Sequence, residues 1–102
     1  MMTSTKISSQ NKPRRLEDLI SIGPAMLRDF QLLGIGSVTQ LAHANPHKMY
    51  KRLCELTGRP QDLCCLDVFQ AAVAQARNPK LPPEKCVWWY WSQKRKARRG
   101  KA

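Results

Sequence analysis

The residues best suited to bind a ligand lie in the segment 21–25, whose sequence is SIGPA. Pro24 suits the first position of a helix, where its missing N–H is not needed, and Gly23 lets backbone amides approach a ligand closely. Exposed amides at a helix amino terminus attract anions. We therefore expect a phosphate-binding turn here, supported by the guanidinium of Arg28 one helical turn further on.

Four cysteines could in principle supply the thiolates of a tetrahedral zinc site. They are Cys54, Cys64, Cys65 and Cys86. The closely spaced pairs typical of zinc sites are missing, because Cys64 and Cys65 are adjacent and point to different faces of a helix. Cys54 and Cys65 fall on apolar stripes, which is typical of buried cysteines that act as small hydrophobic residues. We expect neither a metal nor another cofactor.

Acidic and histidine side chains offer little basis for catalysis. Two acid–base pairs can be assembled on paper, from His43 with His47 or from Asp62 with Asp67. Asp62 is already explained as a helix cap, and His43 lies in a turn. The sequence shows no glycine-rich nucleotide loop, nucleophile motif or metal-ligand spacing. We therefore expect no catalytic residues, no enzymatic activity and no small-molecule substrate.

The net charge of +11 is concentrated at the two ends of the chain. Residues 1–15 carry four basic and no acidic side chains, and residues 92–102 carry six basic and none acidic. We expect 1–14 and 93–102 to be mobile basic tails, since they are too polar to join a core. Such tails either attract phosphate without sequence preference or serve only solubility. An anionic membrane is a third option, but the tails lack an apolar face, so no membrane partner is expected.

Targeting signals are not evident in the sequence. No stretch approaches the roughly 20 apolar residues of a membrane span, and the first residues, MMTSTKISSQNKP, lack the apolar core of a signal peptide. We expect a cytoplasmic protein whose cysteines are reduced thiols.

Helical periodicity organises the span between the tails. A short helix is predicted at 16–20, and a second carries an apolar stripe that ends at Gly34, a residue suited to a left-handed position. The stripe consists of Met26, Leu27, Phe30 and Leu33. Ser37 with Gln40 is a possible capping box for a third helix, whose inward residues are Val38, Leu41 and Ala42.

Start and stop signals delimit two further helices. Asn45 and Pro46 would begin a helix that ends near Gly58. Its inward-facing residues are Met49, Tyr50, Leu53, Cys54 and Leu56. Asp62 is a plausible cap for a fifth helix, which Asn78-Pro79 ends. No strand-like alternation appears, so residues 15–92 should form one all-α domain of about five short helices with a Trp-rich segment at its end.

The first helix pair, LEDLISIGPAMLRDFQLLGI, resembles the helix-hairpin-helix DNA-binding motif. The span 37–58 repeats the plan as a degenerate second copy, which implies a SAM-like bundle of two hairpins. Together with QDLCCLDVFQAAVAQARNP and the cluster Trp88–Trp91, the chain looks like the small pathogenicity-locus family, whose members are often labelled mitomycin-resistance proteins. The resemblance covers about 16–91.

The resemblance puts the phosphate-facing turn at Ser21, Ile22 and Gly23, followed by Pro24 and Ala25. Two residues depart from the motif. Ser21 replaces the usual first glycine, and it fits the turn only if its φ stays negative or strain is accepted. Ala25 stands where many members carry a lysine or similar polar residue, so one charge-assisted phosphate contact is missing. We therefore expect weak, structure-directed binding.

These residues predict a protein that binds DNA, duplex or single-stranded, through its backbone and without sequence preference. Further contacts are expected from the second turn and the carboxyl-terminal tail, at Lys48, Lys94, Arg95 and Lys96. Trp88–Trp91 either stack on bases or close the core, with Trp89 or Tyr90 the more exposed member. The alternative is a protein-interaction adaptor in which the hairpins are scaffold and the partner is an unidentified protein.

Overall fold

The computed structural model describes residues 14–101, with side chains as far as Ala97. Within this range the chain forms five α-helices, two short 3-10 helices and no strand, so the fold is all-helical as predicted. In chain order the elements are η1 (Leu16–Asp18), α2 (Pro24–Leu32), α3 (Val38–Ala42), α4 (Pro46–Thr57), α5 (Leu63–Arg77), η2 (Pro83–Lys85) and α6 (Trp88–Lys101). None of the helices described is long and apolar enough to cross a membrane.

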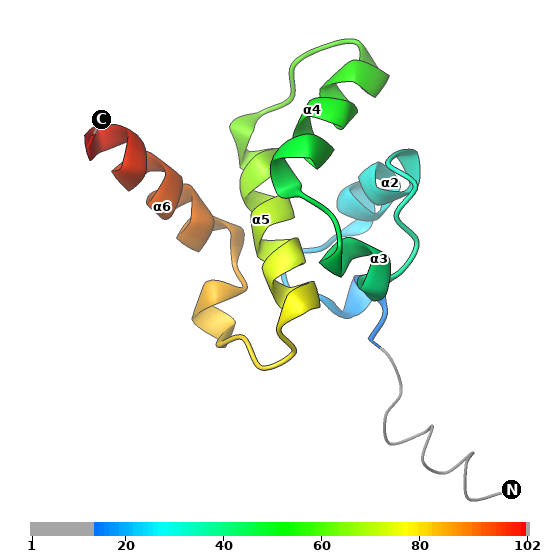
Figure 1. Cartoon of the computed structure of the whole chain (residues 1–102), viewed down its shortest axis with the longest axis horizontal. Coiled ribbons are helices and arrows are strands. Elements are labelled where there is room, and N and C mark those ends of the chain that lie inside the picture. Colours follow the sequence, from blue (N-terminus) through cyan, green and yellow to red (C-terminus); the bar gives the residue numbers. More distant parts are fainter. Residues whose placement is uncertain (1–13, 102) are drawn as a thin grey trace, which may run out of the picture.

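Helix α5 is the centre of the fold, with α3 and α4 on one side and α6 on the other (Figure 1). Small and apolar residues are buried along most of α5, among them Ala71, Ala72 and Val73. A helix that is apolar around much of its circumference must be covered on several sides. Phe69 of α5 and Phe30 of α2 are both fully buried, with their ring centroids 6.0 Å apart. They join α2 to the rest of the core.

Local signals set most helix ends as predicted. The Asn45 side chain accepts hydrogen bonds from the amides of His47 and Lys48, at 2.9 and 3.1 Å, and α4 ends at Gly58 with a left-handed φ of 72°. Ser37 accepts from the Gln40 amide at 3.1 Å. The Gln40 side chain, however, binds the amide of the residue before Ser37, so the capping box is shifted by one position.

Three local expectations were wrong. The span 16–20 forms only the single turn η1, because the backbone becomes extended at Leu19. Leu56 is 43% exposed rather than inward, since the last turn of α4 projects beyond the start of α5 (Figure 1). Asp62 occupies the position before α5, but its side chain makes no capping hydrogen bond.

The carboxyl-terminal segment also differs from the expected mobile tail at 93–102, because α6 continues to Lys101 and packs on α5. At the other end, Arg14 belongs to the domain rather than to a tail. Its guanidinium donates to the carbonyls of Gln75 and Ala76 at 2.8 and 3.2 Å. The rest of the expected amino-terminal tail, 1–13, lies outside the described residues.

Candidate nucleic-acid interface

The amino end of α2 is open to solvent. Gly23 lies just before the helix and Pro24 occupies its first turn, as predicted, and no side chain in the described part of the chain caps this end. The first amides of a helix have no partner within the helix, which here leaves those of Ala25 and Met26 available. A Cβ added at Gly23 would meet nothing within 4 Å, so the space beside this residue is clear.

Ser21 adopts a left-handed backbone, with a φ of 72°. Of the two possibilities left by the sequence, the turn therefore accepts strain instead of keeping φ negative. Such a conformation costs a residue with a side chain roughly 1–2 kcal/mol. The turn thus has the shape that a glycine would favour at this position, although the chain carries serine.

The buried side chain of Gln75 on α5 holds this turn in place. Its Oε1 accepts from the Ile20 amide and its Nε2 donates to the Ile20 carbonyl, both at 2.8 Å, while Nε2 also reaches the carbonyl of Cys86 at 3.3 Å. Gln75 is only 4% exposed. Sequence reasoning missed it, although a lone polar residue within the apolar run AAVAQA was an available signal.

Charge on α2 adds little to the open amides. Arg28 is exposed on the helix, and its neighbour Asp29 is partly buried. Burial raises the pKa of Asp29, while the charge of Arg28 acts in the opposite direction. Arg28 therefore has an acidic neighbour that offsets part of its attraction for phosphate.

The second turn, between α3 and α4, is satisfied by the protein itself. Arg77 at the end of α5 donates to the carbonyls of Ala42 and Ala44 at 2.8 and 2.9 Å, while Asn45 takes the first amides of α4. Lys48 is exposed, so its side chain remains accessible. This geometry favours a structural role for the second hairpin turn and leaves Lys48 as its accessible cation.

Arg95 is not a solvent-facing tail residue, which corrects its expected role. Its guanidinium pairs with the carboxylate of Asp67 through two hydrogen bonds of 3.0 and 2.9 Å, and Asp67 is 1% exposed. The hydrogen bond to Asp67 raises the pKa of Arg95. This bidentate pair fastens α6 to α5 and explains why the helix replaces a tail.

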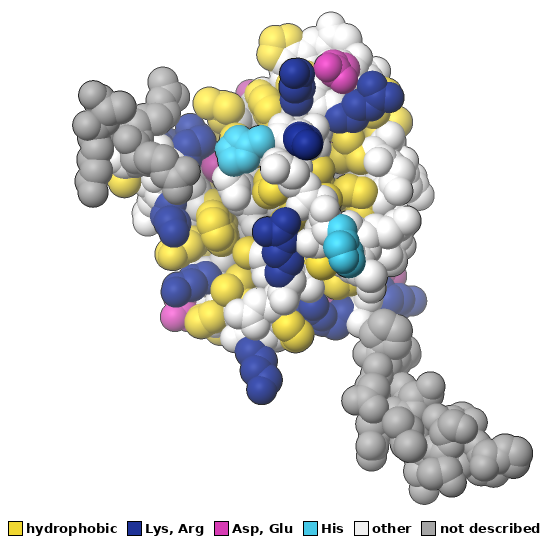
Figure 2. Space-filling view, in the orientation of Figure 1, with side chains coloured by type: hydrophobic (Ala, Val, Ile, Leu, Met, Phe, Trp, Pro, Cys, Tyr) yellow, Lys and Arg dark blue, Asp and Glu magenta, His cyan; other side chains and the backbone are white. Residues whose placement is uncertain are grey.

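The other two predicted cations of α6 differ from each other. The ammonium of Lys94 lies 5.6 and 5.4 Å from the ring centroids of Tyr90 and Trp91, within the range of cation–π attraction. Lys96 is exposed. Figure 2 shows that basic side chains are spread over the visible face and do not gather into one patch.

The aromatic cluster mostly packs, as one of the two interpretations predicts. The Trp91 indole donates to the Lys85 carbonyl at 2.9 Å, and the rings of Trp88 and Trp89 meet edge-on at 5.9 Å. Trp88, Tyr90 and Trp91 are partly buried, whereas Trp89 is 53% exposed. Trp89 is thus the exposed member of the cluster.

The four cysteines are free thiols in different environments. Cys64 is exposed, Cys54 and Cys65 are partly buried, and Cys86 is buried. Burial raises the pKa values of Cys65 and Cys86. Among the residues described, no three His, Cys, Asp or Glu side chains come together in a group that could hold a metal ion.

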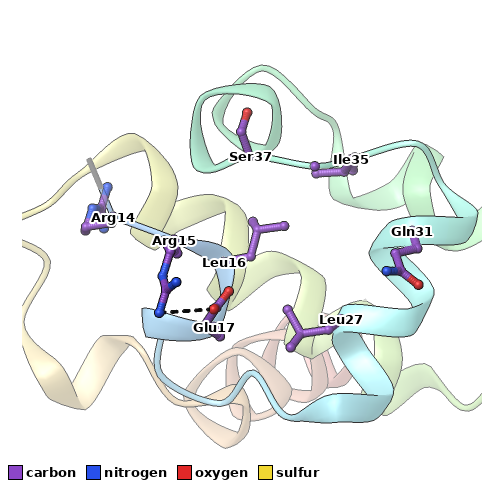
Figure 3. Close-up of a pocket in the computed structure, with 9 residues that line it drawn as sticks. Arg14, Arg15, Leu16, Glu17, Leu27, Gln31, Ile35 and Ser37 are labelled. Atoms are coloured by element: carbon purple, nitrogen blue, oxygen red, sulfur yellow. Dashed lines mark ion pairs between the residues drawn. The ribbon is translucent and has the colours of Figure 1, made fainter. Parts of the chain in front are cut away.

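A cleft of about 470 Å³ lies between η1, α2 and the start of α3 (Figure 3). Leu16, Leu27 and Ile35 contribute its apolar lining, and an ion pair of 3.3 Å between Arg15 and Glu17 lies beside it. The segment 21–25 does not line it. The cleft is therefore separate from the open amides of α2.

Together these observations define an all-helical domain in which the turn before α2 is open and the turn between α3 and α4 is closed. The sequence profile of the pathogenicity locus family matches residues 9–97, and the chain belongs to this family. It is also similar to the mitomycin resistance protein McrB of Streptomyces lavendulae, with 32% identity over 81 residues that cover 79% of this chain and 73% of that protein. No solved structure matches the chain. The family match reaches into α6, beyond the expected limit at residue 91.

Proposed function

We propose that this protein binds DNA through the sugar-phosphate backbone, without sequence preference and without catalysis. The observation that carries the proposal is the contrast between helix ends. Ser37 and Asn45 cap α3 and α4, whereas α2 follows Gly23 and has no side-chain cap. The start of α5 also lacks a capping hydrogen bond, but it follows the carboxylate of Asp62, which would repel a phosphate. A phosphate oxygen is a natural acceptor for such amides.

In the proposed complex, the Ala25 and Met26 amides donate to one phosphate oxygen and Arg28 lies nearby on the same helix. Ser21 and Ile22 shape the turn, and Gly23 keeps the approach free of a side chain. Lys48 and Lys96 are exposed cations that add non-specific attraction for the backbone, which falls as salt rises. Because the primary contact uses neutral amides, we expect the affinity for DNA to be weak. We place this binding in the cytoplasm.

Fluorescence anisotropy of labelled DNA, with duplex and single strand at two salt concentrations, tests this proposal. The key variant is Gly23→Ala, whose methyl group fits the fold and would hinder the close approach of a phosphate that we propose at this turn. A loss of about tenfold in affinity is expected, equivalent to about 1.4 kcal/mol. Gly36→Ala is the matched control, since its added Cβ would lie 3.5 Å from the Gln40 side chain, an ordinary contact.

A protein-interaction adaptor is the second candidate function. It is favoured by the exposure of Leu56 and Leu63, 43% and 41%, on either side of the α4–α5 connection. Large apolar side chains that remain in water are candidates for burial against a partner protein. If the full chain binds neither duplex nor single-stranded DNA at low salt, the DNA proposal is overturned and the adaptor function remains.

A further inference from the structure

Trp89 keeps a large apolar surface in water that packing within the domain does not account for. Its side chain is 53% exposed, whereas the neighbouring aromatic residues of α6 are partly buried. The indole of Trp91 is hydrogen-bonded to Lys85, and Lys94 lies over Tyr90 and Trp91. Trp89 is therefore the aromatic side chain of α6 best placed to meet an external ring.

The surroundings of Trp89 suit a polyanion. Gln93 and Lys96 follow at four and seven positions along α6, so the three side chains lie on one side of the helix, and all are exposed. After Glu84 the sequence contains no acidic residue. An exposed indole beside cations is a recurring way to hold a single nucleic-acid strand, because every base offers a π-face for stacking.

Trp89 and the open turn of the first hairpin are connected through the side chain of Gln75. The Nε2 atom of Gln75 donates both to the Ile20 carbonyl and to the Cys86 carbonyl, so these two points of the chain are neighbours. Gly23 follows Ile20 by three residues, and Trp89 follows Cys86 by three. Three residues span at most about 10 Å, so Gly23 and Trp89 each lie within about 10 Å of one of these two neighbouring points. A single-stranded segment of several nucleotides can reach both places.

We propose that Trp89 stacks on an unpaired base of a DNA strand whose phosphate is bound at the amino end of α2. This inference rests on the proposed function and names its ligand more closely, as DNA with a single-stranded segment. The amides of α2 bind the backbone in either form of DNA. Trp89 adds affinity only where a base is free to leave its partner.

Anisotropy titrations of the full chain with a single-stranded oligonucleotide and the blunt duplex of the same sequence test this inference. Trp89→Ala should lower the affinity for the single strand about tenfold and leave the duplex affinity within twofold. Trp89→Phe, which keeps an aromatic face, should retain most of the single-strand affinity. Leu32→Ala, which shortens a side chain that is 55% exposed elsewhere on the domain, is the control and should change neither affinity.

The outcomes separate this inference from the proposed function. If Trp89→Ala binds the single strand like the original chain while Gly23→Ala weakens it, stacking is disproved and backbone binding stands. If Trp89→Ala weakens both forms of DNA equally, the indole does not read an unpaired base and the inference fails. If neither substitution changes binding, the proposed function fails as well. Circular dichroism of each variant confirms that the helices are retained.

Discussion

The side-chain amide of Gln75 pairs with both backbone polar groups of Ile20, accepting from the N–H and donating to the carbonyl at 2.8 Å each. The two residues are 55 positions apart in the sequence. The turn that precedes Gly23 is therefore held by α5. Any role of the turn in binding depends on Gln75, although this side chain is itself buried.

Gln75→Leu is expected to lower the free energy of unfolding by about 2 kcal/mol, because it leaves buried backbone groups without partners. It should also speed hydrogen exchange at the Ile20 amide and weaken DNA binding. Urea denaturation and amide exchange measure these effects. Gln70→Leu on the same helix is the control, and equal losses in the two variants would contradict the positioning role.

Ser21→Gly is expected to raise the free energy of unfolding by about 0.5 kcal/mol. Glycine removes the strain of the left-handed backbone, and this gain exceeds the cost of the larger conformational entropy that glycine gives the unfolded chain. Gly34→Ala should lower it by about 1 kcal/mol, because Gly34 has a φ of 76° and its surroundings have room for the added Cβ. Urea denaturation of both variants checks the pair. A loss of stability in Ser21→Gly would show that the serine side chain stabilises the turn.

Arg95→Ala is expected to destabilise the domain by about 3 kcal/mol, because the buried Asp67 carboxylate loses its partner. Lys96→Ala, which alters an exposed cation on the same helix, should change stability by less than about 0.5 kcal/mol. Chemical denaturation followed by tryptophan fluorescence compares the two. Similar stabilities would contradict the conclusion that this ion pair fastens α6 to α5.

Stability should fall as the pH rises above about 9. The ordinary thiol pKa is 9.0, and burial raises the pKa values of Cys65 and Cys86 above it in the folded chain. The unfolded chain therefore loses its thiol protons first, which favours unfolding once the pH passes 9. Urea denaturation at several pH values should show this decline, with a smaller slope in Cys86→Ala. A rise in stability above pH 9 would contradict it.

Local features of the fold were predictable from the sequence because they depend on neighbouring residues. Asn45 caps the amides that follow it, and Gly58 supplies a left-handed φ where α4 ends. The family was also identified correctly from its motifs. Exposed Leu56 was missed because periodicity shows which face a residue occupies but not where the covering helix ends.

Long-range pairs were not predictable. Asp67 lies 28 positions from Arg95. Because the segment around Arg95 is rich in Lys and Arg, the sequence does not mark this arginine as the partner of Asp67. The same limit applies to Arg77, whose contacts close the second turn. The sequence therefore indicated a site in each hairpin, whereas the structure leaves open amides at the first turn and satisfies the second.

The central claim is that the first amides of α2 contact a DNA phosphate, and amide chemical shifts measured by NMR during a DNA titration test it most directly. The account predicts that the Ala25 and Met26 resonances of the full chain shift progressively with added DNA. In Gly23→Ala these shifts should shrink, while they persist in Gly36→Ala. Shifts confined to basic residues such as Lys48 and Lys96, with Ala25 and Met26 unchanged, would contradict the claim.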